Sequence, residues 1–256
     1  MIVQDQLAEI ITKVGREIKK NRSLAGDSKW DGDQLKTKAD IFAHTILKYE
    51  LLSLQKIPII SEEDVETHLI YRPDKYWIID PIDGTRSFAD GYPSWVTQVA
   101  LVENGVVVNA AIYAPDLDLL YLASLGNGAF LNGDRIIVKN SDMNQIRLID
   151  NYPEPRGIAE KMMKMIPCKS YIESGSISLK ICRIADGSAD LFVKDVTIRD
   201  WDVAAPMLVL EEAKGILRTG YGKTFLLSNN FDKFGLVVSS SKKVKNMAVD
   251  IMNNLY

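Results

Sequence analysis

The sequence predicts a mixed α/β protein whose N-terminal part is of the α+β type and whose C-terminal part is of the α/β type. In the first part, two helix-like segments precede a run of strand-like segments. In the second part, which begins near residue 146, strand-like and helix-like segments alternate. These two orders are typical of different layer architectures. We therefore expect two subdomains that share one interface, residues 1–145 and residues 146–256.

Two amphipathic helices are predicted before the first strand. Apolar residues recur at helical spacing between Leu7 and Ile18, which gives the first helix one apolar face. The second helix begins at Thr37, and its apolar positions continue to Leu51. Residues 21–36 are polar and contain several turn formers, so they are predicted to form a loop between the two helices.

The predicted strands are short apolar runs bounded by turn signals. In the N-terminal part they cover residues 57–60, 77–79, 94–102, 106–113 and 118–123, with Asn104-Gly105 as a hairpin turn. In the C-terminal part they lie near residues 146–150, 170–173, 190–193, 225–227 and 235–238. Helices are predicted there at residues 156–165, at 176–185, at 203–210 and from about 241 onward.

The composition is typical of a globular protein that binds neither a nucleic acid polymer nor a membrane. Of the 256 residues, 46% are apolar and 25% are charged, and the net charge of -3 comes with dispersed Lys and Arg. No apolar run is long enough to cross a bilayer. Asp5 and Glu9 interrupt the N-terminal segment, unlike in a signal peptide. Cys168 and Cys182 fit no disulfide or metal spacing, so we expect free thiols and a cytoplasmic location.

The stretch Asp80-Pro81-Ile82-Asp83-Gly84-Thr85 ends a buried strand and carries two carboxylates three residues apart. The proline stiffens this spacing, and Gly84 allows a ligand to approach the backbone closely. Carboxylate oxygens in a tight turn are the ligands that Mg²⁺ prefers. An ordinary polar turn is the alternative interpretation, because Asp, Pro and Gly are common turn formers.

Three further acids occupy the ends of predicted elements. Glu62 directly follows the strand at 57–60, as Asp80 follows its own strand. Asp202 precedes a buried helix, where it would also serve as a helix cap. Asp40 lies in the first turn of the second helix, where a negative charge is favourable in any case.

Taken together, these acids resemble the signature of the inositol monophosphatase superfamily. Its elements are matched in order by Ser61-Glu62-Glu63, by Asp80-Pro81-Ile82-Asp83-Gly84-Thr85 and by Trp201-Asp202-Val203-Ala204-Ala205. Upstream, Thr37-Lys38-Ala39-Asp40 is similar to the Thr-x-Ala-Asp element of the same family. The resemblance implies a five-layered α/β/α/β/α sandwich, a homodimer, and inhibition by Li⁺.

The resemblance also implies a Mg²⁺-dependent phosphomonoesterase that uses two or three ions. By this resemblance, Glu62, Asp80 and the Ile82 carbonyl would hold one ion, and Asp80, Asp83 and Asp202 the second. A third, weaker site would use Glu62 and water, which gives Glu62 a catalytic role as well.

The same resemblance assigns roles to four residues beside the metals. Asp40 and Thr85 would form a pair that orients and deprotonates the attacking water. The backbone N–H groups of Gly84 and Thr85 would bind phosphate oxygens. Asp202 would contact the substrate in addition to the metal.

The substrate is less clearly indicated. The segment Ser174–Lys180 resembles the family's substrate segment, which makes Ser176 and Lys180 candidate contacts. Asp195 lies seven residues before Asp202, where the inositol-hydrolysing branch carries an acid that contacts ring hydroxyls. We therefore expect a small phosphorylated metabolite as substrate, with an inositol monophosphate as the best candidate.

Three alternatives remain open. The Ser-Leu-Lys ending at Lys180 is more similar to the branch that removes the 3′-phosphate of adenosine 3′,5′-bisphosphate, where Lys180 would reach a second phosphate. The stretch Thr85-Arg86-Ser87-Phe88 is similar to that of histidinol-phosphate phosphatases. A catalytically silent member of the family would instead bind a phosphorylated ligand or a protein partner.

Overall fold

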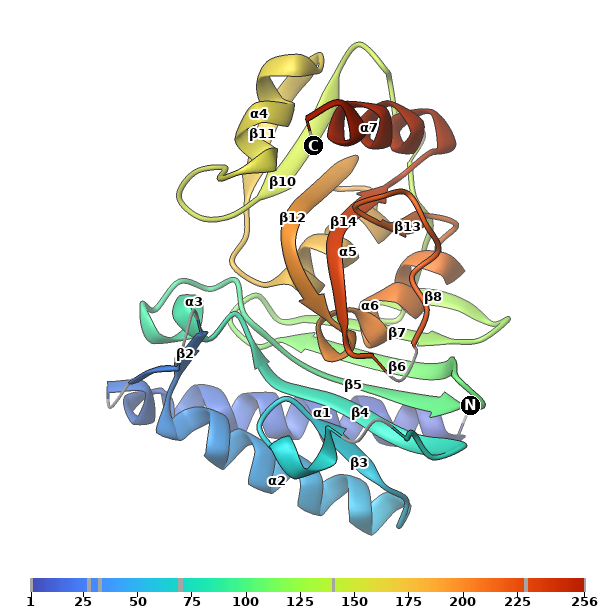
Figure 1. The fold of residues 1–256 in the computed structure, drawn as a ribbon. Helices are drawn as coiled ribbons and strands as arrows, with labels where there is room; N and C mark the ends of the chain where they lie inside the picture. The colour runs from blue at the N-terminus through green and yellow to red at the C-terminus, as the bar shows by residue number, and fades with distance from the viewer. Residues whose placement is uncertain are drawn as a thin grey trace.

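The computed structural model describes residues 2–26, 29–31, 34–68, 71–139, 141–227 and 230–255. Within these residues the chain forms two large β-sheets and three layers of helices (Figure 1). From one side to the other, the layers are helices, sheet, helices, sheet and helices. The five-layered α/β/α/β/α sandwich expected from the family resemblance is therefore confirmed.

The first outer layer consists of α1 (Ile2–Lys20) and α2 (Lys38–Leu54), which pack on the larger sheet. The apolar face predicted for α1 is buried, from Leu7 to Ile18. Burial of each such side chain contributes roughly 1.5–3 kcal/mol relative to exposure. Helix α2 begins with a capping box. The Thr37 side chain accepts a hydrogen bond from the Asp40 backbone N–H, and the Asp40 side chain accepts one from the Thr37 backbone N–H. This box fixes the Asp40 carboxylate at the start of the helix.

The larger sheet has seven strands in the order β3-β4-β5-β6-β7-β8-β9. Strand β3 pairs with β4 in parallel, and all other neighbours are antiparallel. The predicted hairpin turn is present, and Asn104 and Gly105 both have the positive φ that a two-residue turn demands. The strand bounds are β3 Ile59–Ser61, β4 Lys75–Asp83, β5 Val96–Glu103, β6 Val106–Ala114, β7 Leu119–Ser124, β8 Gly128–Leu131 and β9 Asp134–Ile136.

The smaller sheet has five strands in the order β11-β10-β12-β14-β13. Strand β10 is parallel to both of its neighbours, whereas β14 is antiparallel to β12 and β13. The strand bounds are β10 Ile146–Asp150, β11 Cys168–Glu173, β12 Leu191–Arg199, β13 Ile216–Thr219 and β14 Asp232–Ser239. Helices α4 (Ile158–Met165) and α7 (Lys242–Leu255) cover its outer face.

The central layer consists of α5 (Ile177–Ala185) and α6 (Asp200–Glu212). Both helices contribute to one large apolar core that also receives side chains from the two sheets. Helix α6 is buried nearly all round, as a helix between two sheets must be. The first turns of these two helices therefore lie at the junction of the two sheets.

Several local predictions are corrected by the structure. Residues 22–26 form the 3-10 helix η1 (Arg22–Gly26), and β1 (Lys29–Asp31) and β2 (Gln34–Lys36) form a small hairpin where only a loop was predicted. The strand predicted at 225–227 is absent, because the chain forms β13 a few residues earlier. A second 3-10 helix, η2 (Val65–Thr67), and the short helix α3 (Thr85–Ala89) were also missed. In the described part of the chain, no helix combines the length and apolar character needed to span a membrane.

Candidate active site

Glu62 and Asp80 lie next to each other because β3 and β4 are parallel neighbours. Ser61 is paired with Ile79, so the residues that follow them, Glu62 and Asp80, emerge at the same end of the two strands. Their carboxyl groups lie within hydrogen-bonding reach of each other, and burial together with the charge of Glu62 raises the pKa of Asp80. The parallel between these two acids, noticed in the sequence, thus corresponds to direct contact.

Asp83 lies beyond an irregularity in the pairing of β4 with β5, which separates it from Asp80 along the strand. Its carboxylate accepts hydrogen bonds from the first turn of α5. The donors are the Ser176 hydroxyl at 2.5 Å, the Ser178 N–H at 2.7 Å and the Ile177 N–H at 3.3 Å. Asp83 therefore ties the end of β4 to the positive end of the central helix.

Asp202 lies in the first turn of α6, where one carboxylate oxygen accepts from the Arg199 backbone N–H at 2.8 Å. Gln98 of β5 connects this turn to the acids of β4. Its side-chain amide donates to the Trp201 carbonyl at 3.0 Å and is 3.4 Å from an Asp80 carboxylate oxygen. Acids from β4 and from α6, more than 100 residues apart in the chain, thus meet at the same place.

The electrostatics of the acids reflect this crowding. Burial, followed by the charge of Asp202, raises the pKa of Glu62 well above its ordinary value. Burial and the neighbouring charge of Glu62 likewise raise the pKa of Asp80. Burial and the charge of Asp83 raise the pKa of Asp202 to about 7. Each acid therefore makes ionisation of the next less favourable.

The donor atoms of these acids are of the type that a divalent cation prefers. Four carboxylates and the Ile82 carbonyl supply only oxygen donors, which suit Mg²⁺, and a positive charge among them would relieve their repulsion. The buried Oε1 atom of Gln98 has no hydrogen-bond partner in the part of the chain that the structure describes, so one more polar atom beside the acids is open to a ligand. Among the described residues, no three His, Cys, Asp or Glu side chains would hold one ion as they stand. The acids are neighbours, and binding an ion would require their side chains to turn toward it.

Asp40 and Thr85 lie in contact beside the acids. The Thr85 hydroxyl is 3.1 Å from an Asp40 carboxylate oxygen and 3.1 Å from the Ile82 carbonyl oxygen. Burial is the largest effect on Asp40 and raises its pKa, although hydrogen bonds from Thr37 and Thr85 oppose it. Gly84 has φ of 91°, a left-handed conformation that lets α3 start immediately after β4.

Of the predicted substrate contacts, Ser176 lies with the acids, whereas Lys180 and Asp195 have other surroundings. Ser176 caps α5 and hydrogen-bonds Asp83, so it lies with the acids. Lys180 is fully buried, and its ammonium group donates to the Asn151 side chain at 2.8 Å. Asp195 is half-buried at a bulge in β12 and lies against Gly157 at the start of α4. The roles assigned to these three residues stay predictions.

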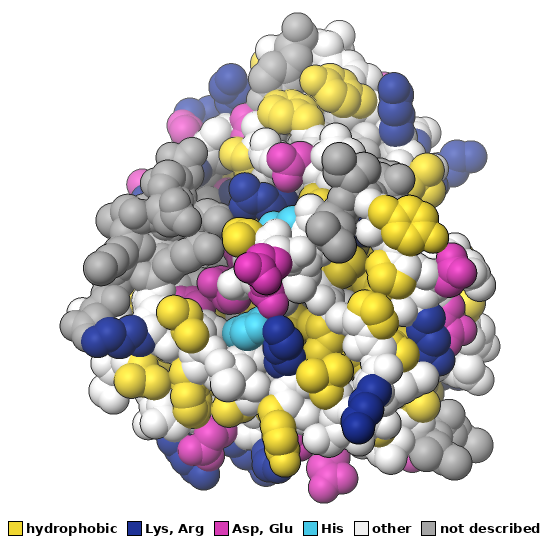
Figure 2. All heavy atoms as spheres, turned by 60° about the horizontal axis from the view of Figure 1, so that its bottom comes forward, with side chains coloured by type: hydrophobic (Ala, Val, Ile, Leu, Met, Phe, Trp, Pro, Cys, Tyr) yellow, Lys and Arg dark blue, Asp and Glu magenta, His cyan; other side chains and the backbone are white. Residues whose placement is uncertain are grey.

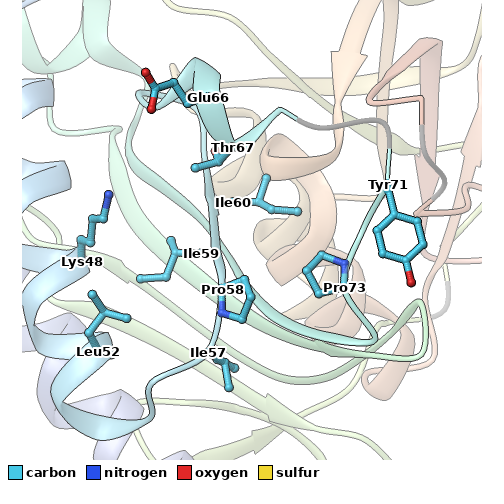
Figure 3. Close-up of a pocket in the computed structure, with 10 residues that line it drawn as sticks. All are labelled: Lys48, Leu52, Ile57, Pro58, Ile59, Ile60, Glu66, Thr67, Tyr71 and Pro73. Atoms are coloured by element: carbon cyan, nitrogen blue, oxygen red, sulfur yellow. The ribbon is translucent and has the colours of Figure 1, made fainter.

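Two cavities lie near the site. One of about 400 Å³ opens between α2 and β3, and none of its lining residues is a predicted metal ligand (Figure 3). Its walls are largely apolar, with Ile57, Ile59 and Tyr71 among them. The other, of about 280 Å³, lies between α3 and the segment after β10, and Arg86, Arg156 and Gly175 help to line it. The second cavity adjoins the acids, because Gly175 directly precedes Ser176 and packs on α3.

Sequence reasoning missed the residues that hold the acids in place. Gln98 gave a usable signal, since it and Thr97 are the two polar residues inside the apolar run at 95–102. Ser178 and Arg199 act through their backbone N–H groups, which no side-chain pattern reveals.

Comparison with known proteins identifies the family and the fold. The model of the inositol monophosphatase family matches residues 2–254. The chain is 33% identical to a fructose-1,6-bisphosphatase/inositol-1-monophosphatase of Thermotoga maritima, over 75% of this chain and 74% of that one. It is 32% identical to a putative Nus factor SuhB of Neisseria meningitidis serogroup A, over 72% and 71% of the two chains. It is also 32% identical to a 3′(2′),5′-bisphosphate nucleotidase CysQ of Buchnera aphidicola, over 73% and 71%.

The same relationship is visible at the level of the fold. The structure superposes on an IMPase of Thermotoga maritima with a TM-score of 0.87 and 26% identity, covering 100% of this chain and 98% of the other. Because the family model and the fold match nearly the whole chain, and the relatives about three quarters of it, the chain belongs to the inositol monophosphatase family of phosphatases.

Proposed function

We propose that this phosphatase hydrolyses the phosphate monoester of a small polyol, with an inositol monophosphate as the best candidate. The observation that carries the proposal is the meeting of acids from β3, β4 and α6 beside the Asp40–Thr85 pair. Such a site can activate water and stabilise a transferring phosphoryl group without a protein nucleophile.

Mg²⁺ would be held by Glu62, Asp80, Asp83 and Asp202 together with the Ile82 carbonyl, as two or three ions. Bound there, the ions would neutralise the phosphate and make a water molecule more acidic. The protein itself orients two of these carboxylates, because Asp83 is fixed by the first turn of α5 and Asp202 by the Arg199 N–H. This arrangement supports the metal assignment through the chemistry of its donors.

The Asp40–Thr85 pair would receive the proton of the attacking water. The Thr85 hydroxyl has one proton and two acceptors within 3.1 Å, the Asp40 carboxylate and the Ile82 carbonyl. When it donates to Asp40, its oxygen lone pairs remain able to accept a hydrogen bond from water. A buried base with a raised pKa is suited to this role.

The phosphate would bind at the start of α3 through the N–H groups of Gly84 and Thr85. Beyond it, Ser176, Asp195 and Asp202 would contact hydroxyl groups of the polyol. Carboxylates accept hydrogen bonds from hydroxyl groups, whereas they repel a second phosphate. These contacts favour a substrate with one phosphate and several hydroxyl groups.

A bisphosphate substrate is the second candidate, and the cavity of about 280 Å³ favours it. Arg86 and Arg156 line that cavity, and guanidinium groups bind phosphate well. Lys180 lies behind its wall, where it hydrogen-bonds Asn151 and the Gly175 carbonyl. Adenosine 3′,5′-bisphosphate would place its second phosphate in this region.

We further propose that the protein acts as a cytoplasmic homodimer that is inhibited by Li⁺. These properties follow from the family resemblance, and the two cysteines, neither of which is in a disulfide, accord with a reducing compartment. Size-exclusion chromatography with light scattering would measure the oligomeric state directly.

Phosphate release from inositol 1-phosphate, adenosine 3′,5′-bisphosphate and histidinol phosphate tests the proposal. We expect the highest kcat/KM with inositol 1-phosphate and no release when EDTA removes divalent ions. Asp80→Asn is the matched control, because it keeps the size of the side chain and removes a predicted metal ligand. A protein that releases no phosphate from any of the three esters at saturating Mg²⁺ would instead support a silent, ligand-binding role.

A further inference from the structure

Ser61, the residue before Glu62, is held at each of its polar groups. Its backbone N–H donates to the Thr67 hydroxyl at 3.1 Å, and its hydroxyl is 2.8 Å from Nδ1 of His44. Its carbonyl oxygen is 2.7 Å from Nε2 of His68. A carbonyl oxygen can only accept, so Nε2 of His68 carries a proton and donates it. Ser61 is fully buried, which makes these bonds more directional than they would be in water.

The His68 ring also contacts the segment that carries Asp202. It stacks on Trp201 with ring centroids 4.5 Å apart and an angle of 24° between the planes. Phe231 completes the group, at 5.6 Å from His68 and 5.3 Å from Trp201. Figure 2 shows histidine side chains and acidic side chains next to one another at the surface of the molecule.

A buried ion cluster holds the same segments together on one side of the rings. Asp200, which is fully buried, pairs with Arg72 and lies 2.5 Å from the ammonium group of Lys233. The Arg72 guanidinium in turn lies over the Phe231 ring at 4.0 Å. The start of α6 is therefore fixed independently of His68. The Ser61 carbonyl accepts from the Asp64 backbone N–H at 3.2 Å and lies 3.5 Å from the Thr67 hydroxyl, and His68, at 2.7 Å, is its shortest contact and the one that links it to Trp201.

We propose that His68 is a positioning residue that couples Glu62 to Asp202 across the boundary between the subdomains. The peptide unit is planar, so holding the Ser61 carbonyl fixes the direction in which Glu62 leaves β3. Stacking on Trp201 sets where that carbonyl lies relative to Asp202. The inference rests on the proposed function only in so far as Glu62 and Asp202 hold metal ions.

Two variants of His68 separate its two contacts. His68→Phe keeps a ring against Trp201 and loses the donor to Ser61, whereas His68→Gln keeps a donor and loses the ring. His44→Phe is the matched control, because His44 contacts the hydroxyl of the same serine and is not part of the Trp201 stack. His68 is only half-buried, so all three proteins are expected to fold, which circular dichroism in EDTA would verify.

Mn²⁺ binding followed by electron paramagnetic resonance gives a readout that is independent of activity. We expect His68→Phe to weaken Mn²⁺ binding about tenfold, the loss typical of residues that orient metal ligands. His68→Gln should weaken it less, and His44→Phe least, while the melting temperatures in EDTA stay within a few degrees of one another. Mn²⁺ affinity within twofold of wild type in His68→Phe would overturn the inference, whatever happens to its melting temperature.

The inference and the proposed function fail in different ways. If the wild-type protein binds Mn²⁺ in a His68-dependent manner and hydrolyses none of the three esters, the inference stands and the proposed function falls. If it hydrolyses an ester and the His68 variants bind Mn²⁺ like the wild type, the proposed function stands and the inference falls.

Discussion

The Thr85 hydroxyl lies 3.1 Å from the Asp40 carboxylate, although the two residues are 45 positions apart in the chain. Asp40 is held by the capping box of α2, and Thr85 by the left-handed turn at Gly84. Neither side chain needs the other for its position, because each is fixed by its own helix start. Their contact therefore results from the packing of α2 against β4 and not from local sequence.

Asp40→Asn is expected to lower kcat by about 100-fold or more, since an amide cannot accept the proton that a carboxylate accepts. Mg²⁺ dependence and melting temperature should change little, because Asn still accepts one hydrogen bond from Thr37. Steady-state kinetics at saturating Mg²⁺ would measure the effect. Thr85→Ser, which keeps the hydroxyl, serves as control and should retain most activity. An unchanged kcat in Asp40→Asn would remove Asp40 from the mechanism.

The stability of the metal-free protein should depend on pH through Asp202. Its pKa in the folded state is about 7, above its ordinary value of 3.8, so between these values the folded state binds more protons than the unfolded state. The contribution of Asp202 to stability is therefore highest below about pH 4 and is lost as pH rises toward 7. Mg²⁺ should restore stability above pH 7, because it binds the ionised acids of the folded state only.

Asp202→Asn isolates this contribution. In EDTA, the melting temperature of the variant relative to wild type should rise between pH 4 and pH 7, because the amide does not ionise. In Mg²⁺ at pH 8 the order should reverse, since the variant lacks a predicted ligand. Melting curves that differ by a constant amount at every pH, with and without Mg²⁺, would contradict the assignment.

The acids of the site could be singled out from the sequence because each lies at the start or end of a predicted element. An acid directly beside an apolar run points to a specific role. For Glu62 and Asp80 the sequence indicated only that each follows a strand, and the parallel pairing of β3 with β4 is what brings them together. His68 was not predictable, since it lies in an irregular segment after η2 and its contacts come from distant residues. Strands β8 and β9 were missed because each has four residues or fewer, β8 begins at a glycine, and Asn132-Gly133 separates the two.

Lys180 shows a different limit of sequence reasoning. From its position in the predicted helix, the Lys180 side chain could have faced solvent or contacted the substrate. The structure instead buries it completely. Its ammonium group is compensated by Asn151 and by the more distant Asp150, at 2.8 Å and 4.0 Å. No local pattern reveals a buried lysine, because its partners come from β10 and the segment that follows it.

This burial predicts a second effect of pH on stability, of the opposite sign. Burial, followed by the charge of Lys194, lowers the pKa of Lys180 from 10.5 to about 7. Between these values the unfolded state binds the extra proton, so the contribution of Lys180 to stability grows as pH rises from 7 toward 10.5. Urea unfolding of wild type and Lys180→Met at pH 6.5, 8 and 9.5 would measure it. The wild-type protein should gain stability relative to the variant across this series, and a constant difference would show that Lys180 keeps its ordinary pKa.

Gly175 and Ser87 are in close contact where the segment before α5 packs on α3. A Cβ atom on Gly175 would lie 1.7 Å from the Ser87 hydroxyl oxygen and 3.0 Å from the Ser94 carbonyl oxygen. Only a residue without a side chain allows the segment before α5 to approach α3 this closely. Ser176, which follows Gly175, is thereby brought within reach of Asp83.

Gly175→Ala is therefore expected to destabilise the protein by about 1–3 kcal/mol, the usual cost of overpacking, and to lower activity by displacing Ser176 from Asp83. Ser87→Gly in the same chain removes both Ser87 atoms that the new methyl group would meet, so the double variant should recover part of the lost stability. Gly26→Ala is the matched control, since nothing lies within 4 Å of its added Cβ. Urea unfolding and phosphate release on the wild type, Gly175→Ala, Ser87→Gly, the double variant and the Gly26→Ala control would test this coupling. Strictly additive effects of the two substitutions would mean that α3 and the segment before α5 move apart freely, and the contact would then have no part in holding the acids together.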